Sequence, residues 1–356
     1  MDFTFRSDGI DAPPGTPAEV DDRISADDAL KRVRKGEWLL YRGDFHNAKQ
    51  LLSAMGRRLN PGPKPASLLE AWKSERRLRG EQARTQGHLL VELDAAYRLA
   101  LPRAPEVKQA CEWAWGPAKG RTLTPLKTLL GVLGAAQWRT KGLKVPGLEG
   151  TLEPHYGVYT PTRFEYLALL DGLEAKDKRV FDLGAGTGVL SFVLLQRGAK
   201  SAIGTDVEPA AVSCATANAA RLGFADRFTA VERDGFPDGR ADLVVCNPPW
   251  IPEAPKSRLD RAVYDEGGKW VERFLSELPL HLEPGGRGVL LISDLAELIG
   301  LRPKGWLEER IAHAGLTVEQ LRETAPQHPK SRDEEDLLFE ARSKERILLF
   351  VLHKTP

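Results

Sequence analysis

The hydrophobic pattern of the chain changes near residue 149. Beyond it, short apolar runs alternate with segments in which apolar residues recur at helical spacing, as in residues 178–200, 201–223 and 241–294. Buried parallel strands give such continuous apolar runs, and helices connect them. The pattern predicts an α/β fold over residues 149–356, Rossmann-like and doubly wound, with helices on both faces of a parallel sheet. Such sheets bind ligands at the carboxyl ends of their strands.

The preceding residues, 27–148, predict a small, mainly helical domain. Apolar residues recur at helical spacing in 48–55, and residues 68–85 form a strongly basic helical pattern. Only residues 87–94 resemble a strand. Residues 1–26 are rich in Asp, Pro and Gly with few apolar anchors, so we expect a disordered acidic tail there.

Composition is that of an ordinary globular protein, with 42% hydrophobic and 28% charged residues. Cys111, Cys214 and Cys246 lie far apart without a C-x-x-C pair, so the sequence predicts neither a disulfide framework nor a metal site. No apolar stretch approaches the roughly 18 residues that span a bilayer, and the N-terminus carries no apolar leader. We therefore expect a cytoplasmic protein with no membrane or metal partner.

Charge is distributed unevenly along the chain, although the formal net charge is only +1. The net charge is −6 over residues 1–30, +13 over residues 31–150 and −6 over residues 151–356. A basic segment beside acidic ones suggests a polyanionic partner, RNA or DNA, for the middle segment. The alternative is that its Lys and Arg residues only solvate helix faces, because no alternation of basic and aromatic residues marks a stacking surface.

A glycine-rich turn follows the first apolar run of the C-terminal region. In "VFDLGAGTGVLS", Asp182 lies near the end of the run, and Gly184, Ala185, Gly186 and Gly188 lie in the turn. Glycine has no Cβ, so the backbone can approach a ligand closely there. Taken alone, the turn fits either a dinucleotide site or a simple tight bend.

Two further acids end the next two apolar runs. Asp206 in "IGTDVEP" ends the second run, and Asp234 in "VERDGFP" ends the third. Asp206 can accept hydrogen bonds from both hydroxyls of a ribose, and Asp234 can accept the exocyclic amine of an adenine. Each acid alone would more simply cap a helix. Three acids at successive strand ends instead predict a cofactor site, to which we also assign Val207.

The segment "VVCNPPW" (Val244–Trp250) ends the fourth run. Pro248 and Pro249 donate no backbone hydrogen bond and fix φ, so they end the strand and stiffen the chain after it. The Asn247 side-chain oxygen and the Pro248 carbonyl can accept both hydrogens of a planar NH₂ group, and Trp250 can stack on the group that carries it. The four residues 247–250 are thus predicted to be catalytic; a purely structural strand terminator is the alternative.

Together these motifs resemble those of class I S-adenosylmethionine-dependent methyltransferases with an Asn-Pro-Pro-aromatic motif. "DLGAGTG" is similar to the first motif of the family, Asp206 to its ribose-binding acid and Asp234 to its adenine-side acid. Upstream, "HYGVYTPTRFEYLALL" resembles the segment that closes over the cofactor, with Tyr159 and Thr160 at the matching turn. The resemblance implies a methyltransferase domain over 149–356 with S-adenosyl-L-methionine as cofactor. A dinucleotide dehydrogenase would leave "NPPW" unexplained.

The resemblance leaves the methyl acceptor open. The basic segment favours a nucleobase amine in DNA or in RNA, such as ribosomal or transfer RNA, with residues 31–150 contacting phosphates. The alternative is N5-methylation of a protein glutamine, as in the HemK/PrmC release-factor methyltransferases, although these usually carry Tyr in place of Trp250. A small-molecule acceptor or a non-catalytic module of this fold also remains, but the intact motifs argue against the module. Tyr264 and Asp265 are further candidates to line the pocket.

Overall fold

The computed structural model describes residues 3–60 and 62–355. The chain divides into two compact units, unit 1 (Met1–Gln137) and unit 2 (Trp138–Pro356). The division lies within helix α5 (Leu126–Lys141), about ten residues before the boundary expected from the sequence.

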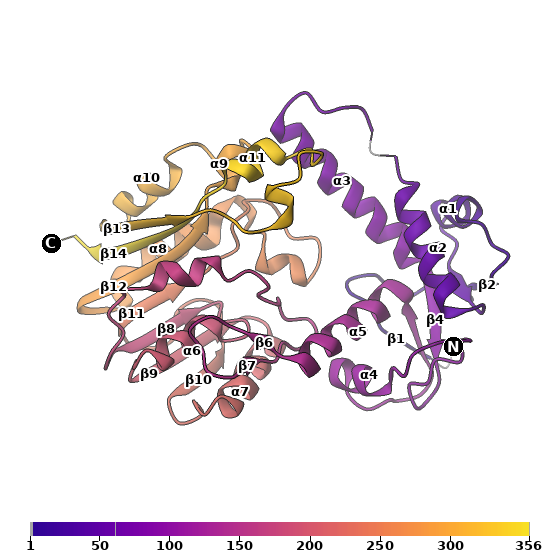
Figure 1. Cartoon of the computed structure of the whole chain (residues 1–356), viewed down its shortest axis with the longest axis horizontal. Helices are drawn as coiled ribbons and strands as arrows, with labels where there is room; N and C mark the ends of the chain where they lie inside the picture. Colours follow the sequence, from indigo (N-terminus) through magenta and orange to yellow (C-terminus); the bar gives the residue numbers. More distant parts are fainter. Residues whose placement is uncertain (1–2, 61, 356) are drawn as a thin grey trace. The chain divides into compact units, whose positions relative to one another are not determined.

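Unit 2 is built around a seven-stranded sheet (Figure 1). The strand order is β10-β9-β8-β11-β12-β14-β13; β8 to β12 run parallel to one another, and β14 is antiparallel to both β12 and β13. The doubly wound α/β prediction is therefore confirmed. The strands are β8 (Arg179–Leu183), β9 (Ser201–Asp206), β10 (Phe228–Glu232), β11 (Ala241–Cys246), β12 (Leu282–Ser293), β13 (Leu316–Thr324) and β14 (Ile347–Lys354).

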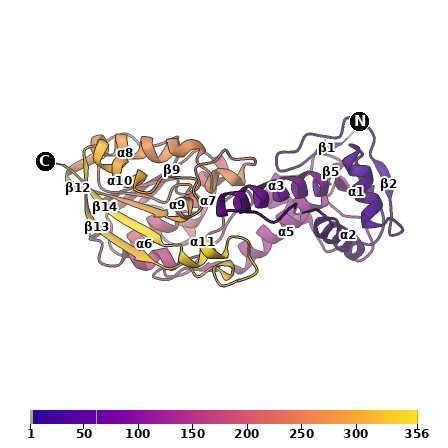
Figure 2. The same cartoon turned by 90° about the horizontal axis from the view of Figure 1, so that it is seen from above.

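Helices bury both faces of this sheet, and successive strand residues point to opposite faces. Val180 packs in the core with α6 (Val189–Gln196) and α7 (Pro209–Arg221). The next residue, Phe181, packs in the other core with α8 (Lys269–His281) and α10 (Trp306–His313). Figure 2 shows α8 and α10 on one side of the strands and α6 on the other. The continuous apolar runs of the sequence reflect this two-sided burial.

The order of the strands reverses between β8 and β11. From β8 the chain first adds β9 and β10 on one side, and then adds β11 and β12 on the other. Leu183 pairs with Cys246 in the ladder between β8 and β11. The glycine turn and the Asn-Pro-Pro-Trp segment therefore follow neighbouring strand ends, at the point where ligands bind in such sheets.

Unit 1 contains a five-stranded sheet in the order β1-β5-β4-β3-β2. Its strands are β1 (Thr4–Phe5), β2 (Ala18–Val20), β3 (Leu39–Tyr41), β4 (Leu89–Leu93) and β5 (Thr122–Pro125), and its helices are α1 (Ala26–Arg34), α2 (Phe45–Arg57), α3 (Leu68–Gly87), α4 (Lys108–Trp115) and α5. Two expectations are corrected. Residues 4–5 and 18–20, placed in a disordered tail, are strands. The domain expected to be mainly helical is α/β; most of its strands were missed because strands this short show no alternation in sequence.

Short elements complete unit 2: β6 (Leu143–Lys144) paired with β7 (Thr151–Leu152), α9 (Leu295–Leu298), α11 (Phe339–Lys344), and the 3₁₀ turns η1 (Glu165–Leu170), η2 (Leu259–Ala262), η3 (Glu266–Gly268) and η4 (Pro329–Ser331). Within the described residues, no helix is long and apolar enough to cross a membrane. Nor do residues 3–60 and 62–355 bring together three His, Cys, Asp or Glu side chains that could hold a metal ion.

Candidate active site

The glycine turn after β8 has the left-handed backbone that favours glycine. The φ angles of Gly184, Gly186 and Gly188 are 71°, 55° and 85°. A Cβ on Gly184 would meet no atom within 4 Å, and one on Gly186 would come no closer than 4.0 Å. A Cβ on Gly188 would instead lie 2.4 Å from the Phe192 ring. The first two glycines thus leave open space for a ligand, whereas Gly188 permits close helix packing.

Asp182 lies beneath this turn rather than on its open side. Its Oδ2 accepts hydrogen bonds from the backbone N–H of Ser191 (3.1 Å) and from its hydroxyl (2.7 Å). Burial raises the pKa of Asp182 to about 6, since a low dielectric penalises the charged form. These bonds anchor the start of α6 to β8, and the cofactor contact expected of Asp182 from the sequence stays a prediction.

Asp206 joins the end of β9 to the glycine turn. Its Oδ2 accepts the Gly186 N–H (3.0 Å) and its Oδ1 accepts the Glu208 N–H (2.9 Å). A carboxylate oxygen can accept a second hydrogen bond, so both oxygens retain capacity for ribose hydroxyls. Burial raises the pKa of Asp206. The structure thus brings together two residues that the sequence placed in one site.

Thr205, the residue before Asp206, was missed by the sequence analysis. Its carbonyl accepts the N–H groups of Gly184 (2.9 Å) and Ala185 (3.0 Å), and its hydroxyl donates to the Gly235 carbonyl (2.7 Å). It therefore connects the loops that follow β8 and β10. In the sequence it stands out only as a polar residue directly before the acid that ends the run.

Val207 and Asp234 lie at the exposed side of the site. Val207 is 45% exposed. Arg273 of α8 donates to Oδ2 of Asp234 (2.7 Å) and to its carbonyl (3.0 Å). This pairing neutralises one oxygen of Asp234, and the predicted contact with an adenine amine would use the other.

Glu153, which precedes the segment that carries Tyr159 and Thr160, is connected to the glycine turn through Asn218 of α7. Oδ1 of Asn218 accepts the Glu153 N–H (2.8 Å), and its Nδ2 donates to the Thr187 carbonyl (3.3 Å). Asn218 is buried and was not predicted from the sequence. Tyr159 is half exposed, which leaves its ring accessible to a ligand.

The Asn-Pro-Pro-Trp corner has an internal hydrogen bond. The Trp250 indole Nε1 donates to Oδ1 of Asn247 at 3.0 Å. Pro248 is buried, whereas Asn247, Pro249 and Trp250 are partly exposed. The Trp250 ring packs against the cores on both faces of the sheet. The corner is thus fixed against the protein interior, and Trp250 is not a freely presented stacking face.

After the corner, residues 251–265 form a loop that leaves the corner and returns to it, and we call this loop the excursion. Ile251 donates to the Val263 carbonyl (3.0 Å) and accepts the Asp265 N–H (2.8 Å). Arg258 and Arg261, at η2 of this excursion, both donate to the carboxylate of Glu208. Glu208 follows Asp206 by two residues, so these ion pairs connect the loop after the Asn-Pro-Pro-Trp corner with the loop after β9. We call this connection the strap.

The comparisons with known proteins agree with this geometry. Residues 160–248 match the model of the family described as ribosomal protein L11 methyltransferase (PrmA). A candidate protein N5-glutamine methyltransferase of Methanocaldococcus jannaschii is 31% identical over 191 residues, which are 50% of this chain and 95% of that protein. The chain belongs to the class I S-adenosylmethionine-dependent methyltransferases. S-adenosyl-L-methionine is therefore the cofactor of this methyltransferase, and the open space above Gly184 and Gly186 fits it.

Three further matches cover part of the methyltransferase. The release factor glutamine methyltransferase of Cereibacter sphaeroides is 39% identical over 128 residues, 32% of this chain and 46% of that protein. The chain spans 30% of an L11 methyltransferase of Haemophilus influenzae. A methyltransferase structure from Geobacter sulfurreducens with bound S-adenosyl-L-homocysteine covers 55% of this chain and 91% of its own, with 20% identity and a TM-score of 0.37.

The excursion residues expected to line the pocket have mainly structural contacts in this methyltransferase. Asp265 accepts the backbone N–H groups of Trp270 (2.9 Å) and Val271 (3.1 Å) at the start of α8. Burial raises its pKa. Tyr264 is 9% exposed and lies opposite Ile251. Asp265 therefore holds the excursion on α8.

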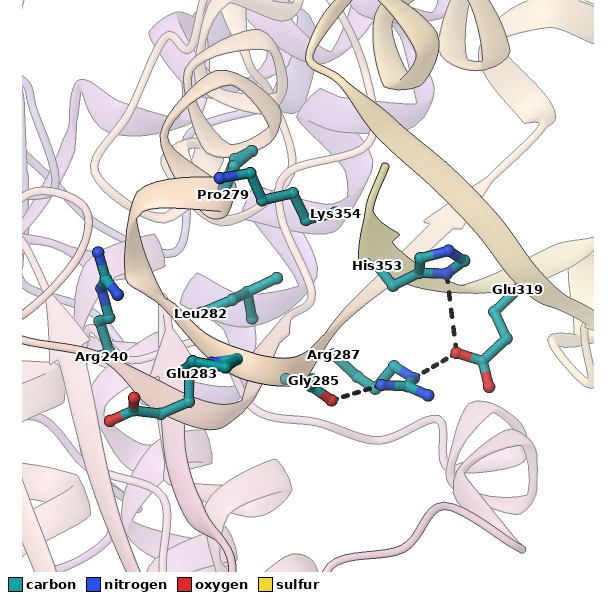
Figure 3. Close-up of a pocket in the computed structure, with 11 residues that line it drawn as sticks. Arg240, Pro279, Leu282, Glu283, Gly285, Arg287, Glu319, His353 and Lys354 are labelled. Carbon is teal, nitrogen blue, oxygen red and sulfur yellow. Dashed lines mark hydrogen bonds and ion pairs between the residues drawn. The ribbon is translucent and has the colours of Figure 1, made fainter. Parts of the chain in front are cut away.

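A cavity of about 470 Å³ lies at the opposite ends of the strands, away from the glycine turn (Figure 3). The start of β12 and the end of β14 line it. Arg287 forms an ion pair with Glu319, and Nδ1 of His353 lies 3.9 Å from the same carboxylate. Because methyltransferases of this fold bind at the carboxyl ends of the parallel strands, we assign this cavity no part in methyl transfer.

Proposed function

We propose that this methyltransferase transfers a methyl group to the side-chain amide nitrogen of a glutamine in a protein. The observation that carries the proposal is the position of the Asn247 and Pro248 acceptors beside the glycine turn. The matching half of this chain is 31% identical to the M. jannaschii protein and covers 95% of that protein. The expectation from the sequence put a nucleobase first. The relatives support the glutamine alternative better.

The chemistry requires residues that hold a weak nucleophile in line with the methyl group. When bound, S-adenosyl-L-methionine supplies a methyl group on a positively charged sulfur. An amide nitrogen is a poor nucleophile because its lone pair is delocalised. Asn247 and the Pro248 carbonyl accept its two hydrogens, which aims the nitrogen and favours charge development as the C–N bond forms and the C–S bond breaks. The nitrogen then releases one proton to water.

A nucleobase amine is the second candidate, and the net charge of +13 over residues 31–150 favours it. However, the basic helix α3 is partly neutralised in the structure. Arg79 pairs with Glu75, while Arg77 and Arg34 both pair with Glu81. Internally paired arginines release fewer counterions from a phosphate backbone. The net charge of +13 already counts Glu75 and Glu81, so the pairing limits which arginines can meet phosphates and leaves the charge itself unchanged.

The test is transfer of label from methyl-labelled S-adenosyl-L-methionine into an extract of source cells that lack the gene. We expect protease to release the label, N5-methylglutamine to appear after complete enzymatic digestion, and labelled methylamine to appear after acid hydrolysis. The Asn247→Ala protein is the matched control for adventitious labelling. Label released by nuclease instead would replace the glutamine proposal with the nucleobase candidate.

A further inference from the structure

Trp250 is the aromatic residue of the Asn-Pro-Pro-Trp corner, and the chemistry of its ring has a consequence for Asn247. An indole N–H only donates hydrogen bonds, whereas a phenol hydroxyl both donates and accepts. The Trp250 N–H lies 3.0 Å from Oδ1 of Asn247. Because the amide nitrogen of Asn247 is itself a donor, the indole can pair only with the oxygen. The bond therefore selects one of the two orientations of the Asn247 amide.

Trp250 is also held at its backbone. Nη2 of Arg302, which follows α9, donates to the Trp250 carbonyl at 3.3 Å. Arg302 is 5% exposed, and its guanidinium lies 4.8 Å from the centre of the Trp306 ring. Burial lowers the pKa of Arg302, while the nearby charges of Glu297 and Asp265 oppose that shift. The buried Arg302 thus holds the backbone of Trp250, and Asn247 accepts the hydrogen bond from its indole.

We propose that Trp250 is a positioning residue, which acts through its indole N–H on Asn247 and is braced by Arg302. The bond occupies one lone pair of the Asn247 oxygen and holds the other toward the methyl acceptor. The reversed amide would present its NH₂ group to the NH₂ group of the acceptor, and two donors repel each other. The inference rests on the proposed function only in that the acceptor carries N–H hydrogens, which both glutamine and a nucleobase amine do.

The first test separates the N–H from the ring. Trp250→Phe keeps an aromatic side chain but loses the donor. Trp270→Phe is the matched control, because Trp270 is also partly buried against the same core and stacks on Phe274. With the extract fraction that takes up label as acceptor, we expect Trp250→Phe to lower the rate on the order of 10- to 100-fold. Affinity for S-adenosyl-L-methionine should change less than about twofold, as should both quantities in the control.

The second test needs no acceptor, so it decides the inference even if the glutamine proposal fails. In a ¹⁵N–¹H spectrum of the full chain, the indole signal absent from Trp250→Phe belongs to Trp250. We expect this signal to exchange slowly with solvent, to lose protection in Asn247→Ala and to keep it in Asn247→Asp, whose oxygen still accepts. A signal unaffected by Asn247→Ala, or an unchanged rate in Trp250→Phe, would overturn the inference.

Discussion

The acids near the ends of β2 and β3 in unit 1 and of β8 and β9 in unit 2 have opposite pKa shifts. In unit 1 the pKa of Asp22, after β2, is lowered by the hydrogen bond from Tyr41, and that of Asp44, after β3, by the hydrogen bond from Arg103. In unit 2 burial raises the pKa of both Asp182 and Asp206. The first pair is stabilised by side-chain partners within the protein. The second is held by backbone N–H groups and Ser191, which leaves Asp206 able to bind a ligand.

The glycines beside these acids differ in the same way. A Cβ on Gly43 of unit 1 would lie 2.5 Å from the Asp22 carboxylate, so the chain itself fills that turn. The corresponding position of Gly184 in unit 2 is open. A carboxylate after a parallel strand therefore does not by itself predict a ligand site. The site requires an acid without a basic side-chain partner beside a turn that the protein leaves unfilled.

The sharpest distinction between the units is the catalytic corner, which unit 2 alone carries among the described residues. Asn247→Ala removes an acceptor that matters most as bonds form, so we expect the rate of methyl transfer to fall on the order of 1,000-fold. Calorimetry should show the affinity for S-adenosyl-L-methionine within about twofold of the original. Equal losses of rate and affinity would contradict the catalytic assignment.

The pH dependence of stability tests the raised pKa of Asp182. Because the pKa of Asp182 is raised from 3.8 to about 6, its contribution to stability is full below about pH 4 and is lost as the pH rises through 6, a change of about 3 kcal/mol. Asp182→Asn keeps an acceptor for Ser191 without a charge. The free energy of unfolding in urea, variant minus original, should therefore increase by about that amount from pH 4 to pH 8. A constant difference would show that the raised pKa is wrong.

The acid of the open site should control the cofactor, unlike its counterpart in unit 1. We expect Asp206→Ala to weaken S-adenosyl-L-methionine binding about 10- to 100-fold, because ribose hydroxyls lose their acceptor. Asp44→Ala is the matched substitution in unit 1, where the lost partner is Arg103. It should lower thermal stability and leave cofactor affinity unchanged. If Asp206→Ala and Asp44→Ala bound S-adenosyl-L-methionine with similar affinity, the distinction between the two acids would be wrong.

Filling the turns tests the glycines. An alanine at Gly186 must adopt a φ near 55°, which costs about 1–2 kcal/mol, and it narrows the approach of the cofactor. We expect Gly186→Ala to weaken binding about tenfold. Gly43→Ala instead clashes with Asp22, so it should reduce stability by about 1–3 kcal/mol with normal binding. Calorimetry and thermal unfolding of both variants separate these outcomes.

The smallest effect concerns the strap. Glu208→Gln removes the charge that Arg258 and Arg261 share, but both arginines are more than half exposed. Exposed ion pairs contribute little, so we expect S-adenosyl-L-homocysteine to dissociate about two- to threefold faster. Stopped-flow measurement with Asp260→Asn as a control on the same excursion checks this. An unchanged dissociation rate would separate the strap from cofactor retention.

Local patterns account for what the sequence predicted. The strands of unit 2 are apolar runs, and Gly184, Asp206 and Asn247 each follow one, so parallel topology places them at one edge. The residues that the sequence analysis missed act across long sequence separations: Thr205 bonds to the Gly235 carbonyl, Asn218 to Glu153, and Arg302 to the Trp250 carbonyl. No spacing rule indicates such partners. In unit 1 the sequence analysis found β4, within residues 87–94, but missed β1, β2, β3 and β5, because two to four residues carry no period.

The strap also makes the enzyme responsive to ionic strength. Both of its arginines lie in contact with solvent, where added salt screens their attraction to Glu208 within about 8–10 Å. Salt should therefore loosen the connection between Glu208 and the two arginines and speed the exchange of spent cofactor for fresh. Binding of a polyanionic substrate weakens under the same conditions. The sign of the salt effect on turnover thus reports whether the slow step belongs to the cofactor or to a charged acceptor.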